Sequence, residues 1–134
     1  MKVVVIDGQG GRLGALICEA IKKNELDVDT YAIGTNSVAT AQMLKAGAKY
    51  GATGENPVIV AAKDADFIIG PIAILSADSL LGEITPEMAV SIGQSKAIKL
   101  LLPVSHCDNL VVGIQDLTMN ELVEKTVEQL KALI

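Results

Sequence analysis

The chain has 134 residues, a length typical of one domain that buries about two-thirds of the surface of its unfolded form. Half of the residues are apolar but only 2% are aromatic, so we expect a core of Val, Ile, Leu and Ala, as in parallel sheets buried on both faces. The formal net charge of −5 argues against a nucleic-acid partner and against an anionic membrane surface.

Strands and helices alternate along the first hundred residues. Short runs rich in Val and Ile predict strands at 2–7, 28–34, 48–51, 66–70 and 97–104. The apolar periodicity between these runs predicts helices at 11–23, 37–46, 57–64 and 86–94. Asn56 and Thr85 are expected to cap the last two of these helices, because each is followed by a proline suited to a first helical turn. The pattern at 72–85 is apolar and predicts only a loop with a helical turn.

The end of the chain is expected to contribute an edge strand and a helix. The run LVVGI at 110–114 follows the fifth strand across the turn-like stretch SHCDN, and so short a connection predicts an antiparallel hairpin at the edge of the sheet. Thr118–Glu121 reads TMNE, the spacing of a capping box that opens a C-terminal helix. One face of this helix is expected to be apolar, formed by Leu122, Val123, Leu130 and Leu133.

The order of these elements predicts one Rossmann-like α/β domain over residues 1–134. The sheet is expected to be doubly wound and mostly parallel, in a three-layer arrangement with helices on both faces, an antiparallel edge strand and a C-terminal helix. In such sheets ligands bind beyond the carboxyl ends of the strands, so the loops at those ends are the candidate site.

The first of these loops is rich in glycine. GQGGRLG directly follows the strand 2–7 and fits the spacing G-x-x-G-x-x-G. A strand that turns into a helix through glycines can point amide groups at an anion, and the helix dipole adds to the attraction. We therefore expect a phosphate-binding loop, with a tight structural turn as the alternative. Its candidate residues are Asp7, Gly8, Gln9, Gly10, Gly11, Arg12, Leu13 and Gly14.

Two charged residues of this loop have two interpretations each. Arg12 in the first helical turn would lie at the unfavourable end of the helix dipole unless a phosphate were bound, and the alternative is a solvated arginine that reaches a surface carboxylate. Asp7 either contacts a ribose hydroxyl or a magnesium-bridged phosphate, or it accepts loop amides in an Asx-turn.

The loop GQGGRLG resembles the GxxGRMG loop of the dihydrodipicolinate reductases, which bind reduced nicotinamide dinucleotides. The shared positions are Gly8, Gly11, Arg12 and Gly14, with Leu13 in place of Met, and the resemblance covers only the first strand and helix. With DGQGG, TGENP and DFIIGP along it, the whole sequence resembles a family of short bacterial Rossmann-like proteins of unknown function. The first resemblance implies an NAD(P)-type cofactor. The second implies a Rossmann-like fold and gives no indication of an activity.

The end of the second strand bears on which nucleotide would bind. An acid at this position selects a dinucleotide without a 2′-phosphate. Here the sequence is GTNS, and Thr35, Asn36 and Ser37 are compatible with the 2′-phosphate of NADP, while capping of the next helix by Asn36 or Ser37 is the alternative. Mononucleotides, coenzyme A and adenosylmethionine stay open. Gly70 and Pro71, at the end of the fourth strand, complete the cofactor-binding candidates.

Evidence for catalytic residues is sparse. His106 is the only histidine of the chain and is the candidate general acid or base, although it falls in a predicted turn beside Cys107 and Asp108. Asp78, Glu83 and Glu87 are expected to be solvated, with acid–base work by paired carboxylates as the alternative. Cys18 is expected in the core. The cysteines at 18 and 107 lack metal-ligand spacing, so no metal is expected.

Two functions are the main candidates, and a structural or interaction protein with an empty loop is a third possibility. The predicted elements use all 134 residues and leave no substrate domain, which favours a nucleotide-binding module without clear catalytic machinery. The alternative is a small homo-oligomeric NAD(P)-dependent oxidoreductase completed by a neighbouring subunit. We expect a cytoplasmic protein that binds a small-molecule nucleotide and self-associates, with residues 68–75 and the C-terminal helix as candidate surfaces.

Overall fold

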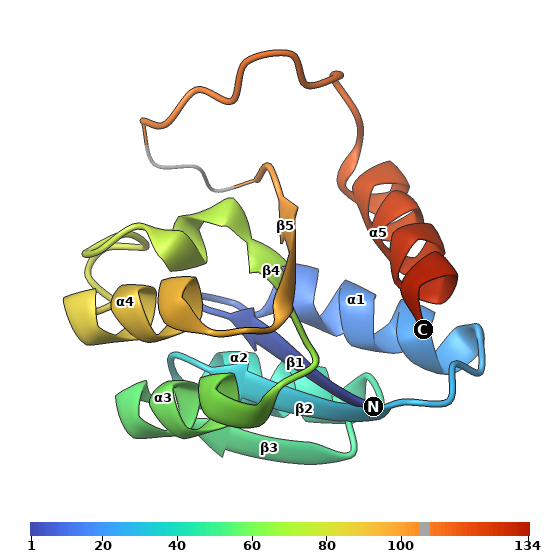
Figure 1. Cartoon of the computed structure of the whole chain (residues 1–134), viewed down its shortest axis with the longest axis horizontal. Coiled ribbons are helices and arrows are strands. Elements are labelled where there is room, and N and C mark those ends of the chain that lie inside the picture. The colour runs from blue at the N-terminus through green and yellow to red at the C-terminus, as the bar shows by residue number, and fades with distance from the viewer. Residues whose placement is uncertain (105–107) are drawn as a thin grey trace.

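The computed structural model describes residues 1–104 and 108–134. Strands and helices alternate along the chain, as predicted (Figure 1). The strands are β1 (Lys2–Asp7), β2 (Asp29–Gly34), β3 (Tyr50–Thr53), β4 (Phe67–Pro71) and β5 (Ile98–Leu102). The helices are α1 (Arg12–Lys23), α2 (Ser37–Lys45), α3 (Glu55–Asp64), α4 (Pro86–Gln94) and α5 (Met119–Leu133), with a 3₁₀ turn η1 (Ile72–Leu75) after β4.

The five strands form one parallel sheet in the order β3-β2-β1-β4-β5. This confirms the predicted Rossmann-like α/β fold with helices on both faces of the sheet. The strand order reverses direction between β1 and β4, so the connections that leave these two strands run to opposite faces. Such a switch point is where an α/β sheet offers a crevice to a ligand.

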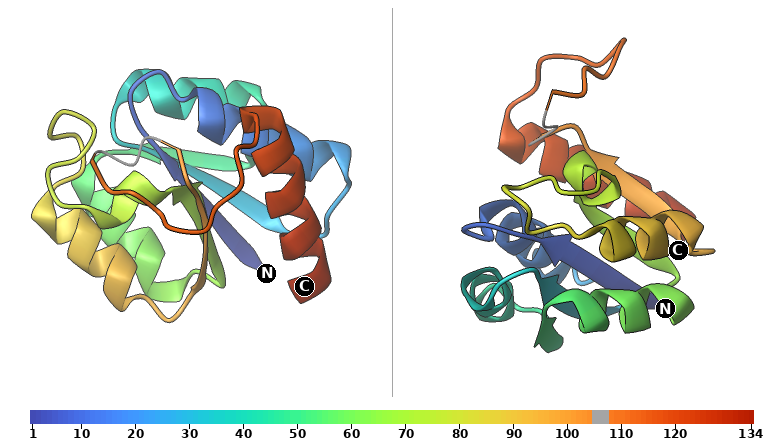
Figure 2. Two further views of the ribbon diagram at one scale, coloured as in Figure 1. Left: turned by 90° about the horizontal axis from the view of Figure 1, so that it is seen from above. Right: turned by 90° about the vertical axis from the view of Figure 1, so that its left-hand side faces the viewer.

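The core has two halves, one on each face of the sheet. Alternate residues of β1 point to opposite faces: Val3 and Val5 pack in the cluster that includes α1, α2 and α5, whereas Val4 and Ile6 pack in the cluster that includes α3, α4 and η1 (Figure 2). All four of these side chains are fully buried. The predicted aliphatic core is therefore confirmed, with β1 at its centre.

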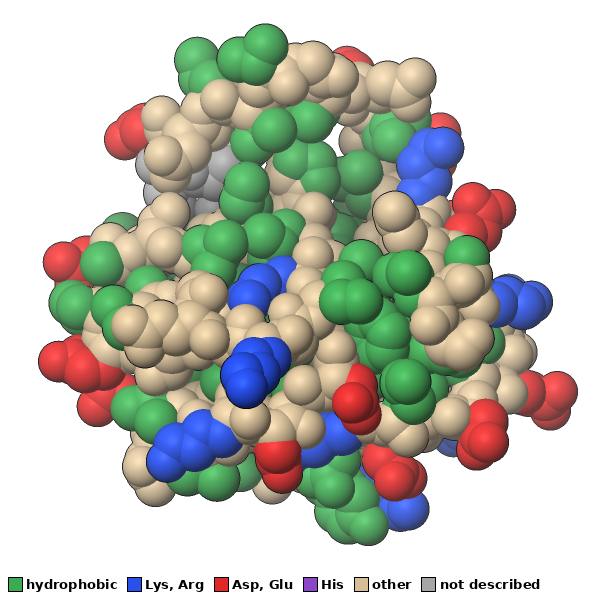
Figure 3. All heavy atoms as spheres, in the orientation of Figure 1, with side chains coloured by type: hydrophobic (Ala, Val, Ile, Leu, Met, Phe, Trp, Pro, Cys, Tyr) green, Lys and Arg blue, Asp and Glu red, His purple; other side chains and the backbone are tan. Residues whose placement is uncertain are grey.

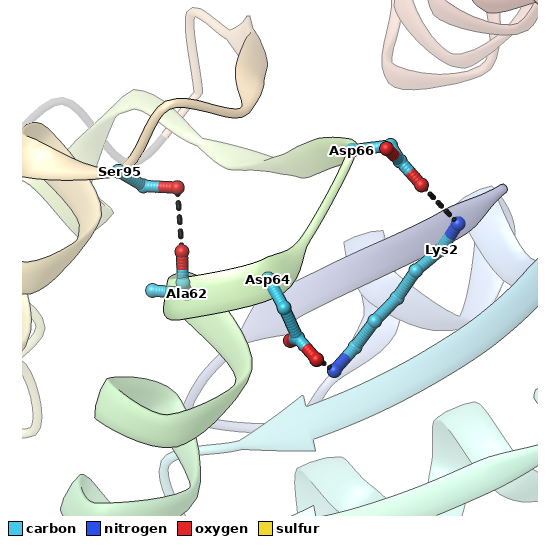
Figure 4. Close-up of polar contacts among 5 residues, drawn as sticks. All are labelled: Lys2, Ala62, Asp64, Asp66 and Ser95. Carbon is cyan, nitrogen blue, oxygen red and sulfur yellow. Dashed lines mark hydrogen bonds and ion pairs between the residues drawn. The ribbon is translucent and has the colours of Figure 1, made fainter.

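Polar contacts tie the elements together at the amino edge of the sheet (Figure 4). The Lys2 Nζ lies 2.6 Å from Asp64 Oδ1, and the Lys2 backbone amide donates to Asp66 Oδ2 at 2.7 Å. Nearby, Ser95 Oγ donates to the Ala62 carbonyl at 2.6 Å. These groups satisfy one another, which gives them a structural role at the edge opposite the candidate site.

The predicted antiparallel edge strand is wrong. Residues 110–114 form no strand, and all pairings of the five-stranded sheet are parallel within the described part of the chain. Residues 108–118 instead arch away from the sheet, and α5 packs against α1 (Figure 1). Leu110 and Val112 are 86% and 95% exposed.

Several helix boundaries differ from the prediction. Asn56 is no cap: α3 begins two residues earlier than predicted, after Gly54, whose φ of 106° is a conformation suited to glycine. Pro57 then lies in the first turn, where the backbone N–H that proline lacks would have no acceptor within the helix. The strand β3 starts two residues later than expected, and β4 continues through Pro71.

The two capping predictions at Thr85 and Thr118 are confirmed. Thr85 Oγ1 accepts from the Met88 amide at 3.2 Å, and Thr118 and Glu121 form the reciprocal capping box at 3.2 and 3.1 Å. The buried face of α5 is formed by Val123, Thr126, Val127 and Leu130. Leu133 was expected on this face but is 45% exposed.

The surface predicted for self-association at 68–75 is mostly buried. Ile68, Ile69, Ala73 and Ile74 are fully enclosed by the protein's own core, because β4 is an interior strand and η1 packs on α4. Apolar side chains gather instead on the face that carries β5, below the segment leading to α5 (Figure 3). None of the helices in residues 1–104 and 108–134 is long and apolar enough to cross a bilayer.

Candidate functional site

Three connections meet at the carboxyl edge of the sheet: residues 8–11 after β1, residues 35–36 after β2, and the segment 76–85 between η1 and α4. The last of these is the yellow-green loop beyond β4 in Figure 1, and Figure 2 shows it from two further sides. It reaches across the switch point, because Glu83 contacts both other connections. The site is therefore assembled from parts of the chain that are far apart in the sequence.

The glycines of the first loop have two different roles. Gly11 has a φ of 73°, and a Cβ there would lie 2.6 Å from Ala39 Cα in α2. A Cβ at Gly14 would lie 2.5 Å from the Met43 sulfur of the same helix. These two glycines let α1 approach α2, so they have a structural role in packing. Gly10 has no such constraint, because a Cβ there would meet no atom within 4 Å.

The amides of this loop are partly used by the protein itself. Gly8 and Gly14 donate to Asp7 at 2.8 and 2.7 Å, and Gln9 donates to Glu83 at 2.9 Å. The amides of Gly10, Arg12 and Leu13 donate to no acceptor among the residues that the structure describes, nor does the exposed Arg12 side chain have a partner there. The first turn of α1 therefore retains its capacity to bind an anion.

Asp7 lies beneath the loop. Its side chain is buried, and each carboxylate oxygen accepts one loop amide, which is the Asx-turn interpretation of this residue. Burial raises the pKa of Asp7, against the lowering effect of the hydrogen bonds from Gly14 and Gly8, and the nearby Glu83 charge adds a smaller increase. Since both oxygens are engaged, Asp7 shapes the loop from below.

Glu83 is the residue that sequence reasoning missed. It was expected to be solvated, but its Oε1 accepts from Gln9 N, Thr35 Oγ1 and Asn36 Nδ2 at 2.9, 2.6 and 2.7 Å. Burial alone would raise the pKa of Glu83, but hydrogen bonds from Thr35, Gln9 and Asn36 together outweigh it and lower the pKa. The available signal was its position in the connection after β4, on the ligand edge of the sheet.

The residues after β2 confirm the capping alternative and add a contact. Asn36 Oδ1 accepts from the Ala39 amide at 2.9 Å and so caps α2. Its Nδ2 donates both to Glu83 and, at 2.9 Å, to the Gln9 carbonyl. Ser37 is the exposed first residue of α2. Thr35 and Asn36 thus join the loop after β1 to the segment 76–85, and Ser37 stands apart.

The remaining candidates are not brought into this cluster. Gly70 is buried, and a Cβ there would collide with the Ile6 carbonyl oxygen, so close packing of β4 on β1 accounts for it. Pro71 is the buried last residue of β4. His106 and Cys107 lie outside the described residues, and Asp108 is exposed. Cys18 is a core residue as expected, and burial, followed by the Asp7 charge, raises the pKa of its thiol to about 12.

Two surface hollows lie away from this edge. One, of about 610 Å³, is lined by α1 and α5, and its rim carries charges of both signs, including Glu19, Lys23, Glu124 and Lys131. The other, of about 300 Å³, lies between β5 and α5 and has Leu100, Leu101, Leu102 and Leu122 in its wall. Neither coincides with the ends of β1 and β2, where the unpaired amides and the Glu83 contacts lie.

The parallel sheet, its switch point and the glycine loop define a Rossmann-like α/β protein. The chain belongs to the DUF3842 family, described as a domain of unknown function, because the family model matches residues 2–134. This agrees with the resemblance to a family without a known activity.

The comparisons with curated proteins and solved structures do not indicate a function. No curated protein matches the chain significantly. Among solved structures, the chain resembles a dodecameric FMN-dependent Ubix-like decarboxylase from Escherichia coli O157:H7, with 14% identity and a TM-score of 0.49, over 98% of this chain and 95% of that one. A likeness of this level is too weak to transfer the flavin, the reaction or the dodecamer to this protein.

Proposed function

We propose that this protein is a nucleotide-binding module that holds an NAD(P)-type dinucleotide at the carboxyl ends of β1 and β2. The observation that carries the proposal is a set of three amides without an acceptor in the described part of the chain: that of Gly10 in the loop before α1, and those of Arg12 and Leu13 in the first turn of α1. They lie at the switch point of the sheet, where α/β proteins bind ligands.

The chemistry of this turn suits a phosphate. The unpaired amides and the helix dipole both favour negative charge, and the exposed Arg12 guanidinium can add a bidentate contact. Gly10 leaves open space over the loop, so a phosphate can approach the backbone closely. Arg12 is otherwise placed unfavourably in the first turn of a helix, and a bound anion removes that cost.

The choice of a dinucleotide rests on two features. The loop shares Gly8, Gly11, Arg12 and Gly14 with the dihydrodipicolinate reductases, although the family match adds nothing to that resemblance. In addition, Thr35 and Asn36 place polar groups after β2, the position that contacts the adenosine ribose in dinucleotide-binding domains.

A second copy of the chain is the partner we propose. In residues 1–104 and 108–134, β5 pairs only with β4, so its outer edge is unpaired. The run 110–114 was predicted to form a strand but contains a turn at residues 112–113, and its side chains Leu110 and Val112 are almost fully exposed. Pairing of this run with β5 of another copy would cover both features. Light scattering coupled to gel filtration tests this: Val112→Lys is expected to give monomers, and a monomeric wild type would refute it.

Ligand screening by thermal denaturation tests the proposed function. The panel contains oxidised and reduced dinucleotides, ATP, coenzyme A and adenosylmethionine. A ligand at a hundred times its dissociation constant adds about 2.7 kcal/mol to the free energy of unfolding, which corresponds to about 10 °C for a chain of 134 residues. We expect a dinucleotide to give such a shift.

The variants Gly10→Val and Arg12→Gln are expected to lose most of the shift. Gly93→Val is the matched control, because Gly93 is also surrounded by open space but lies in α4. An unchanged melting temperature with every ligand would refute the proposal. Turnover of a carbonyl substrate with the bound dinucleotide, lost in His106→Ala, would instead support the oxidoreductase alternative.

A further inference from the structure

A carboxylate from a distant segment occupies the place where a dinucleotide-binding domain contacts the ribose. In such domains an acid at the end of the second strand accepts hydrogen bonds from the ribose hydroxyls. Here β2 ends at Gly34, and the residues that follow are neutral. Glu83 brings its carboxylate to this position from the connection between β4 and α4.

The contacts of Glu83 define where its carboxylate lies. Gln9 N belongs to the loop after β1, and Thr35 Oγ1 and Asn36 Nδ2 follow β2, so the carboxylate lies between the ends of these two neighbouring strands. All three donors bond to Oε1. The second oxygen, Oε2, has no partner among the described residues, so the carboxylate keeps acceptor capacity for further hydroxyl groups.

The segment that carries Glu83 is anchored in the protein. Ser79 is buried and its Oγ donates to the Ala73 carbonyl at 2.5 Å, and Leu80 is buried in the core cluster of α3 and α4. Glycine at position 8 permits the close approach, since a Cβ there would lie 3.0 Å from Leu80 Cδ1 and 3.2 Å from Glu83 Oε1. Glu83 is therefore a positioned side chain and no ordinary surface acid.

We propose that Glu83 is the ribose-binding residue of this site, and that the ligand is a nucleotide with free 2′- and 3′-hydroxyl groups. This inference rests on the proposed function. Two hydroxyls are donors that a carboxylate can accept, whereas a 2′-phosphate would bring two like charges together without an added cation. In the sequence, the absence of an acid at the end of β2 favoured NADP. In the structure, Glu83 places a carboxylate at this position from a distant part of the chain.

Binding measurements on four proteins and two ligands test the inference. Calorimetric titration of NAD⁺ and NADP⁺ into the wild type is expected to give a dissociation constant at least tenfold lower for NAD⁺. In Glu83→Gln the ratio is expected to fall to within about threefold, chiefly because NAD⁺ binds more weakly. Glu87→Gln, which removes the same charge from the exposed first turn of α4, is the matched control and should keep the wild-type ratio. Glu83→Asp, with its shorter side chain, should weaken NAD⁺ binding without admitting NADP⁺.

A second measurement uses only the wild type, so its result does not depend on whether the variants fold. ADP is expected to bind at least fivefold more tightly than 2′-deoxy-ADP, because the deoxy compound lacks one donor to the carboxylate. Two results would overturn this inference and leave the proposed function intact. One is a wild type that binds NADP⁺ at least as tightly as NAD⁺. The other is a Glu83→Gln variant that keeps the wild-type ratio of the two dissociation constants. Failure of every nucleotide to bind the wild type would overturn both.

Discussion

The substitution Gly11→Ala separates the structural role of the glycine loop from its ligand-binding role. Gly11 has a φ of 73°, and its missing Cβ would lie 2.6 Å from the Ala39 backbone. An alanine in this left-handed conformation costs roughly 1–2 kcal/mol. Separating α1 from α2 to make room costs about 1–3 kcal/mol more, and the lower entropy of the unfolded chain returns about 0.4–1 kcal/mol.

The sum predicts a loss of about 1–5 kcal/mol in the free energy of unfolding. For a chain of 134 residues this corresponds to a melting temperature lower by about 4–16 °C. Urea denaturation of the ligand-free protein, followed by circular dichroism, measures the effect without a nucleotide. Equal slopes in urea for the variant and the wild type would show that only stability has changed.

Gly10→Ala is the matched control in the same loop. Its new methyl group would meet no atom within 4 Å, so we expect between no change and about 1 kcal/mol of added stability. If Gly11→Ala and Gly10→Ala unfold at the same urea concentration, glycine at position 11 is not needed for the close approach of α1 and α2. The division of the loop into packing glycines and an open glycine would then fail.

Three further predictions concern individual side chains. Because the pKa of Glu83 is lowered by folding, its contribution to stability is present above the ordinary glutamate range and is lost as the pH falls through its folded value. Glu83→Gln should therefore destabilise the protein more at pH 7 than at pH 3, as measured by urea denaturation, and an effect independent of pH would contradict this. In Cys107→Ser, the Cys18 thiol, with a pKa of about 12, should not react with a maleimide at pH 8 until the protein unfolds, and labelling of the native state would show that Cys18 is accessible. Leu81 is 97% exposed with a φ of 57°, so Leu81→Asn should raise the free energy of unfolding by about 0.5–1 kcal/mol, and a loss of stability on thermal denaturation would show an unseen packing role.

Local patterns were sufficient for most of the fold. The run KVVVID predicted the central strand, because a strand buried on both faces is apolar at nearly every position. The capping boxes at Thr85 and Thr118 were visible because a cap depends on residues three positions apart. Where the outcome depended on distant parts of the chain, the prediction was wrong. The strand propensity of 110–114 gave no sign that the segment had to cross from β5 to α5.

The candidate site shows the same limit. The sequence placed Gly10, Arg12 and Asn36 at the carboxyl edge, because each directly follows a strand that could be recognised. It also offered the Asx-turn interpretation of Asp7 and the capping role of Asn36, both of which depend on neighbouring residues. Glu83 was missed because its contacts with Gln9 and Thr35 span 74 and 48 residues, and the left-handed turn at 80–82 that presents it has no recognisable sequence pattern.

Titration of NAD⁺ into ¹⁵N-labelled protein, followed by amide chemical shifts, tests the central claim most directly. The account predicts that the largest shifts fall on the unpaired amides of Gly10, Arg12 and Leu13, with Thr35 and Asn36 next, and that Gly10→Val abolishes them. Absence of shifts with NAD⁺ and with every other nucleotide of the panel, or shifts confined to the hollows beside α5, would contradict it.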